Sequence, residues 1–135
     1  MELFDDGKRR LFSPGKSEIP ITRYFEALSY AVHKIGAGSV SSVLIAGLES
    51  IKSTIKGAKK LIDIGVIPTI MPFRPYDNCE MSDYPVTNPK DLLIIEAEIN
   101  EYLKQKDLKY NYASGCLNCN ACIGNDLIIS YKKQS

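Results

Sequence analysis

Residues 39–75 read SVSSVLIAGLESIKSTIKGAKKLIDIGVIPTIMPFRP, and the hydrophobic pattern changes twice along them. Val40 to Ala46 is a short, mostly apolar run with β-branched residues, which is typical of a strand buried on both faces. From 51 to 62, apolar residues recur at helical spacing, with lysines mostly on the opposite face. Gly65 then ends the helical pattern, and 66–73 is a second apolar, β-branched run. Because parallel strands need a crossover, this stretch predicts a strand–helix–strand unit.

Two segments precede this unit. Residues 2–5 predict a short first strand, and 6–16 hold Gly, Ser, Pro and four basic residues, which predicts a loop. Lys8-Arg9-Arg10 in that loop is interpreted as a solvated patch, with phosphate contact as the sharper alternative. A helix is expected from Pro20 to Ile35, because apolar residues follow one stripe up to Gly36. His33 near its end is interpreted as a surface or structural residue.

Two segments follow the unit. Residues 76–89 lose any period, and a loop of this length is often functional. Asn88 as N-cap and Pro89 at the first position begin a last helix with an apolar stripe that reaches Leu103. Its acidic residues, Glu96 among them, are expected largely on the outer face.

This order of elements predicts an α/β fold. We expect a partial (β/α) barrel of about three parallel βα units over residues 1–108. An irregular, cysteine-rich tail follows over residues 109–135.

Residues 43–50, VLIAGLES, resemble the fifth-strand motif of radical S-adenosylmethionine enzymes, which usually reads Gly-x-Ile-x-Gly-x-x-Glu. Ile45 and Gly47 match this motif, whereas Val43 replaces its first glycine and Glu49 stands one place early. The Gly-Leu-Glu form is close to the biotin-synthase-like branch of that family.

Residues 70–79, IMPFRPYDNC, resemble the end of the sixth strand, which in that family usually reads Phe-x-Pro-x-Pro-Gly-Thr. Pro75 is present, but Tyr76-Asp77-Asn78 stands where the Pro-Gly-Thr ending would be. The opening residues, 2–16, resemble the fourth strand and its loop. The likeness covers roughly residues 2 to 106 and rests on the order of three units.

The resemblance implies part of an S-adenosylmethionine site. It implies that Ile45 and Gly47 line the adenosine site and that the edge from Phe73 to Pro75 contacts adenine. The same resemblance gives Glu2 and Glu49 as further cofactor contacts, although a solvated carboxylate is an equal interpretation of Glu2.

The family's cluster motif, Cys-x3-Cys-x2-Cys, and its Gly-Gly-Glu motif are not in this sequence. The resemblance therefore implies the C-terminal half of an enzyme core, inactive as an isolated chain. An N-terminal half-protein or a second copy would cover the open sheet edge.

Cys116, Cys119 and Cys122 follow one another at spacings of three, as in the Cys-x2-Cys-x2-Cys run of bacterial-type ferredoxins. Three thiols in this arrangement predict an auxiliary 4Fe-4S cluster. Cys79 is the only other cysteine, and its role as a fourth ligand stays open. Zinc is the main competing metal, and a metal-free redox set is the third alternative.

Composition excludes several classes of protein. The chain has 135 residues, with 44% hydrophobic and 24% charged residues, which is ordinary for a globular domain. A net charge of +1 gives no reason to expect nucleic acid as a partner. No apolar run reaches the ~18 residues of a membrane span, and no apolar signal region begins the sequence, so a cytoplasmic protein is expected.

Two other classes of function stay open. The chain is alternatively a small iron–sulfur electron-transfer module, with the α/β part as a docking platform. It is otherwise an α/β interaction domain stapled by zinc. Metal identity separates the last of these from both iron–sulfur alternatives.

Overall fold

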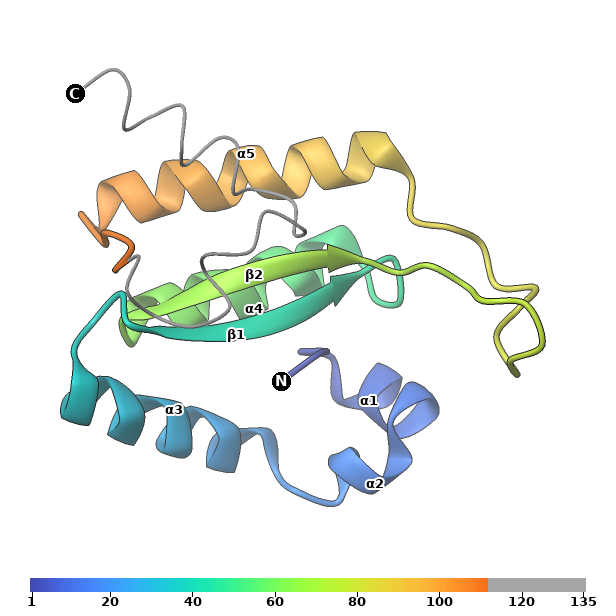
Figure 1. Cartoon of the computed structure of the whole chain (residues 1–135), viewed down its shortest axis with the longest axis horizontal. Helices are drawn as coiled ribbons and strands as arrows, with labels where there is room; N and C mark the ends of the chain where they lie inside the picture. The colour runs from blue at the N-terminus through green and yellow to red at the C-terminus, as the bar shows by residue number, and fades with distance from the viewer. Residues whose placement is uncertain (112–135) are drawn as a thin grey trace.

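The computed structural model describes residues 1–111, and the predicted cluster ligands Cys116, Cys119 and Cys122 lie outside these residues. The described part is a mixed α/β fold with one two-stranded parallel sheet and five helices (Figure 1). The elements in chain order are α1 (Asp6–Phe12), α2 (Pro14–Ser17), α3 (Ile21–Ile35), β1 (Val40–Ala46), α4 (Ile51–Asp63), β2 (Val66–Pro72) and α5 (Pro89–Gln105). None of these helices is long and apolar enough to cross a membrane.

The central strand–helix–strand prediction is confirmed. β1 and β2 are parallel and in register from Val40 opposite Val66 to Ala46 opposite Pro72. Ser50 caps the crossover helix α4, because its side chain accepts a hydrogen bond from the Ser53 N–H at 3.1 Å. The two strands therefore end at the same edge of the sheet.

One face of the sheet forms the hydrophobic core. Figure 1 shows α4 behind the strands, with α5 along one side and α3 along the other. Alternate strand residues meet the buried stripes of α4 and α5, and these contacts form one cluster. Its members are Val40, Leu44, Ala46, Ala58, Leu61, Ile62, Val66, Ile70, Leu92, Ile95 and Ile99. The opposite face carries the intervening residues, of which Ile67 and Thr69 are buried, Ile45 is half-buried and Met71 is exposed.

Residues 6–16 are not the loop that their composition predicts. They form α1 and α2, which Arg9 holds together, and the Arg9 side chain is only 5% exposed. Its guanidinium donates hydrogen bonds to the carbonyls of Lys16, at 2.9 Å, and Ile19, at 2.8 Å. It also pairs with Asp6 at 2.9 Å. The interpretation of a solvated basic patch is therefore wrong for Arg9, because its fork of donors satisfies the carbonyls after two short helices.

Residues 2–5 are not a strand in the described sheet, so three parallel βα units are not confirmed. The Ile45 N–H donates to the Glu2 carbonyl at 2.7 Å, which is one ladder-like contact. The Phe4 and Asp5 N–H groups instead donate to the Glu49 carboxylate. The segment thus runs beside β1 in the same direction, but a side chain takes the hydrogen bonds that a strand would need.

The two outer helices agree with the sequence in position and differ in burial. Asn88 caps α5 and accepts a hydrogen bond from the Lys90 N–H at 3.0 Å, as predicted. Glu96, expected on the outer face, is buried. The helix α3 has no buried residue, so its apolar stripe is only half covered, and His33 near its end is exposed.

Thr87 and Gly47 close the carboxyl ends of both strands. The Thr87 hydroxyl donates to the Ala46 carbonyl at 2.8 Å and lies 3.2 Å from the Phe73 carbonyl. Gly47 makes this approach possible, because its φ is +101° and a Cβ there would lie 2.4 Å from Thr87 Oγ1.

Gly47→Ala is expected to lower the free energy of unfolding by about 2 kcal/mol or more, because alanine meets both an unfavourable φ and the Thr87 hydroxyl. Gly15→Ala in α2 is the matched control, since a Cβ there has no neighbour within 4 Å. Urea denaturation of both variants measures the difference. Equal stabilities would show that the turn tolerates a side chain.

Candidate functional site

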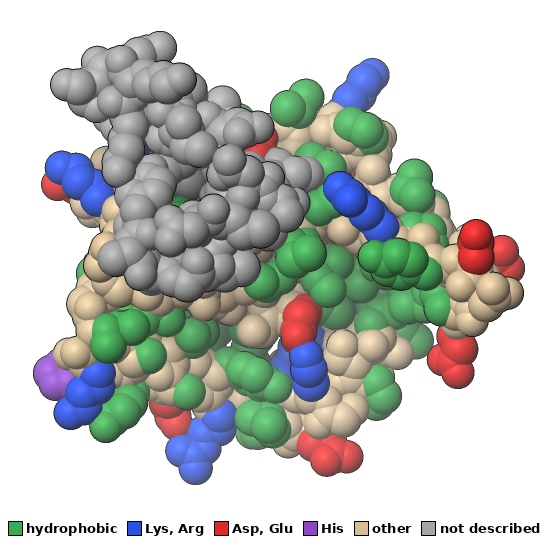
Figure 2. Space-filling model, in the orientation of Figure 1, with side chains coloured by type: hydrophobic (Ala, Val, Ile, Leu, Met, Phe, Trp, Pro, Cys, Tyr) green, Lys and Arg blue, Asp and Glu red, His purple; other side chains and the backbone are tan. Residues whose placement is uncertain are grey.

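The carboxyl ends of β1 and β2 form the candidate site, because ligands of parallel α/β sheets usually bind at this edge. The turn at Gly47 and the loop 73–88 leave from it. Glu49 and Thr87 are its buried polar residues. Hydrophobic side chains gather around the loop after β2 on the face shown in Figure 2.

Glu49 is buried, with 8% of the residue exposed, and its carboxylate is fully engaged by protein groups. Oε2 accepts hydrogen bonds from the N–H groups of Phe4, at 3.0 Å, and Asp5, at 2.7 Å. It also accepts one from the Ser53 hydroxyl at 3.1 Å. Thr54 Oγ1 lies 3.3 Å from Oε1. Glu49 therefore joins the N-terminal segment to the first turn of α4, and its role as a cofactor contact stays a prediction.

Glu2 and Ile45 lie side by side through their backbones. The Glu2 carboxylate forms an ion pair with Lys16. Burial alone would raise the pKa of Glu2, but the hydrogen bond from Lys16 and the nearby positive charges outweigh burial and lower this pKa below its ordinary value. The structure thus pairs Glu2 with Lys16 at a partly exposed position, and its role as a cofactor contact stays a prediction.

Phe73 and Pro75 belong to a loop that folds back onto α1. The Phe73 ring contacts Tyr84 edge to face with centroids 5.6 Å apart, and Tyr84 contacts Phe12 in the same way at 5.4 Å. The Phe73 N–H donates to the Ala46 carbonyl at 2.9 Å. Pro75 is half-buried in the same loop. Tyr84 thus holds the predicted functional loop, residues 76–89, against Phe73 and α1, and contact of Phe73 and Pro75 with adenine stays a prediction.

Cys79 is exposed in a turn of this loop, and its thiol donates to the Tyr76 carbonyl at 3.0 Å. Within residues 1–111, no group of three His, Cys, Asp or Glu side chains is placed to hold a metal ion. Among the described residues Cys79 thus has no metal-binding group around it, and both its role as a fourth ligand and the three-cysteine site stay predictions.

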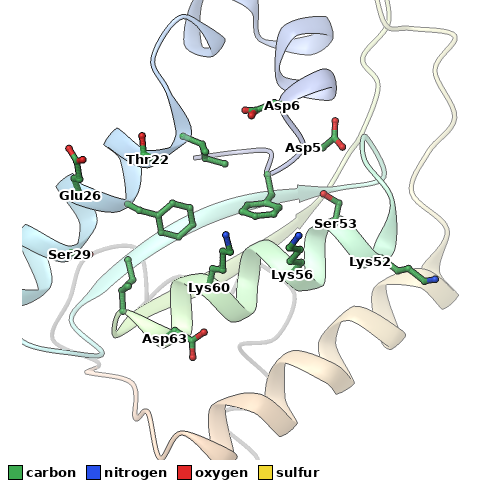
Figure 3. Close-up of a pocket in the computed structure, with 14 residues that line it drawn as sticks. Asp5, Asp6, Thr22, Glu26, Ser29, Lys52, Ser53, Lys56, Lys60 and Asp63 are labelled. Atoms are coloured by element: carbon green, nitrogen blue, oxygen red, sulfur yellow. The ribbon is translucent and has the colours of Figure 1, made fainter.

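A groove lies between α3 and α4, on the helical side of the sheet and apart from the strand ends (Figure 3). It has a volume of about 950 Å³, with Phe4 and Phe25 among its lining residues. Lys52, Lys56 and Lys60 line it from α4. No sequence pattern had indicated this groove. The spacing of four between these lysines places them on one side of a helix and was the signal that could have done so.

Comparison with family models finds no match for this chain, and comparisons with curated proteins and with solved structures find none either. The resemblance to radical S-adenosylmethionine enzymes therefore rests on the residues of the sequence alone.

Glu49→Ala is expected to lower the free energy of unfolding by about 2 kcal/mol, because it leaves the partly buried N–H groups of Phe4 and Asp5 without their acceptor. Glu49→Gln should cost less, about 1 kcal/mol, since one amide oxygen still accepts from those groups. Chemical denaturation of the two variants and the parent protein measures the order. Equal losses of stability in both variants would contradict a stabilising role for the hydrogen bonds from Phe4 and Asp5 to the Glu49 carboxylate.

Proposed function

We propose that this chain is the C-terminal portion of a radical S-adenosylmethionine-like iron–sulfur protein. Cys116, Cys119 and Cys122 would hold its auxiliary 4Fe-4S cluster. The edge formed by Gly47 and Phe73 would contribute part of an adenosine site. The cluster would supply electron-transfer chemistry. Gly47 and Phe73 would shape the edge of the adenosine site.

The observation that carries this proposal is the arrangement of three segments that run in one direction. Residues 2–5, β1 and β2 follow one another with α3 and α4 between them, and α5 comes last. This is the order that the resemblance implies for the fourth, fifth and sixth strands of such a core. Their carboxyl ends converge where Glu49 and Thr87 lie.

The described contacts indicate which of the predicted residues are left to contact a ligand. Glu49 and Glu2 are engaged by protein groups, so we propose that they build the edge and leave ligand contact to others. The backbone at Gly47 and the ring of Phe73 are the groups that stay in the proposed site. Ile45 lies on the face opposite the core, where a barrel interior would be.

The proposed partner is a polypeptide that carries the missing Cys-x3-Cys-x2-Cys motif. It would cover the open edge of the sheet. Near this edge's carboxyl end Met71 is 41% exposed, whereas Ile67 and Thr69 on the same face are buried. A second copy of this chain could cover the same edge but would bring no such motif, because the motif is absent from this sequence. We therefore place the N-terminal half-protein ahead of the homodimer.

Chain geometry favours a cluster without Cys79. Asn111 lies at the amino end of β1, because its N–H donates to the Gly38 carbonyl at 3.0 Å. Cys79 follows the carboxyl end of β2, and seven strand residues span about 23 Å. The five residues from Asn111 to Cys116 extend at most about 18 Å. A site that holds both Cys79 and Cys116 is therefore difficult to reach.

Protein purified without oxygen is expected to contain iron and acid-labile sulfide in equal amounts, close to four of each per chain. Cys116→Ser should lose most of both, whereas Cys79→Ser should keep them. Metal analysis by mass spectrometry and a sulfide assay measure these contents.

Zinc in place of iron would support the alternative of a zinc-stapled interaction domain and contradict the proposal. Loss of iron in Cys79→Ser would show that the cluster needs the fourth thiol.

The isolated chain is expected to bind S-adenosylmethionine weakly, with a dissociation constant of about 1 mM or above, because half of the site lies elsewhere. Calorimetric titration of the cluster-loaded protein measures this constant. Submicromolar binding would contradict the division of the site between two halves.

A further inference from the structure

We propose that the groove between α3 and α4 binds a small organic anion with an aromatic body. This site lies on the helical side of the sheet and does not depend on the proposed function. Its volume of about 950 Å³ is at the upper end of the range for small-molecule sites.

The floor of the groove is aromatic. The rings of Phe4 and Phe25 meet edge to face, with centroids 6.4 Å apart and planes at 87°. Ile21 and Ile64 add aliphatic surface to the same lining. A further aromatic ring can stack on such a pair, because edge-to-face and offset contacts are the favoured arrangements.

Two ammonium groups lie over this floor. Lys56 Nζ is 5.9 Å and Lys60 Nζ is 5.2 Å from the centroid of the Phe4 ring. Both side chains point into the groove in Figure 3, whereas Lys52 points away from it. No carboxylate within residues 1–111 forms an ion pair with Lys56 or Lys60. Two like charges held over one ring favour an anion between them.

The acidic residues of the groove are engaged from outside it. Asp6 pairs with Arg9 at 2.9 Å, and Glu26 pairs with Arg23 at 2.8 Å.

The same holds for Asp63 and Asp5. Lys106 pairs with Asp63 at 2.7 Å, and its hydrogen bond lowers the pKa of Asp63 below the ordinary value. The Asp5 carboxylate caps α1 by accepting from the Lys8 N–H at 2.8 Å. Asp5 keeps its negative charge, but three lysines of the lining, Lys52, Lys56 and Lys60, form no ion pair with a carboxylate of residues 1–111, so the groove presents a net positive charge to a ligand.

This lining selects the ligand by chemistry. A phosphate or carboxylate would sit between the two ammonium groups, and an aromatic body would contact Phe25. A cation would be repelled by the lysines, and a neutral aromatic molecule would leave both charges without a partner. We therefore expect the anionic group to dominate affinity.

The probe is 2-naphthyl phosphate, titrated into the full chain at low salt and followed by its fluorescence. Lys56→Gln/Lys60→Gln is expected to weaken binding at least about tenfold, because charge-assisted contacts are lost. Lys34→Gln/Lys90→Gln is the matched control, since it removes the same charge from lysines that do not line the groove. It should change affinity less than about twofold. Equal weakening in both variants would overturn the site.

Two further measurements test the anionic group and the location. Neutral 2-naphthol should bind at least about tenfold more weakly than 2-naphthyl phosphate. Ser29→Phe should fill the groove from α3 and abolish binding, with circular dichroism confirming an unchanged fold. Binding that survives Ser29→Phe, equal affinity for 2-naphthol, or no binding of 2-naphthyl phosphate at 1 mM to the parent chain would each overturn the proposal.

Discussion

The carboxylate of Glu49 joins parts of the chain that are far apart in sequence. It accepts hydrogen bonds from the N–H groups of Phe4 and Asp5 and from the hydroxyl of Ser53. These bonds connect the N-terminal segment to the first turn of α4. This contact holds Phe4 against α4, where a Cβ on Gly57 would lie 2.7 Å from the Phe4 side chain. The position of α1 and the floor of the groove between α3 and α4 both depend on it.

A second closure operates at the same edge of the sheet. Thr87 connects the end of β1 to the segment after β2, and Gly47 leaves it the necessary space. Because Glu49 and Thr87 are hydrogen-bonded within the protein, a ligand at this edge would depend on other groups, among them the exposed charged residues of the loop 73–88.

The core of the fold could be predicted from the sequence because its signals are local. The strand–helix–strand unit, α3 and α5 each carry a continuous hydrophobic period, and Ser50 and Asn88 are ordinary caps. The short helices α1 and α2 could not be predicted, because Gly7, Pro14 and Gly15 read as loop residues and Arg9 stabilises them through tertiary contacts. Glu49 was found as a candidate residue, but its partners are 44 and 45 residues away, and no local pattern reports them.

Electron paramagnetic resonance of the anaerobically purified protein, before and after reduction with dithionite, tests whether Cys116, Cys119 and Cys122 hold a 4Fe-4S cluster. We expect a silent oxidised state and, after reduction, a signal from a reduced 4Fe-4S cluster. Cys119→Ser should remove this signal and leave the circular dichroism of the α/β core unchanged. A protein that remains silent after reduction and contains zinc would contradict the account and leave an α/β domain with a structural metal.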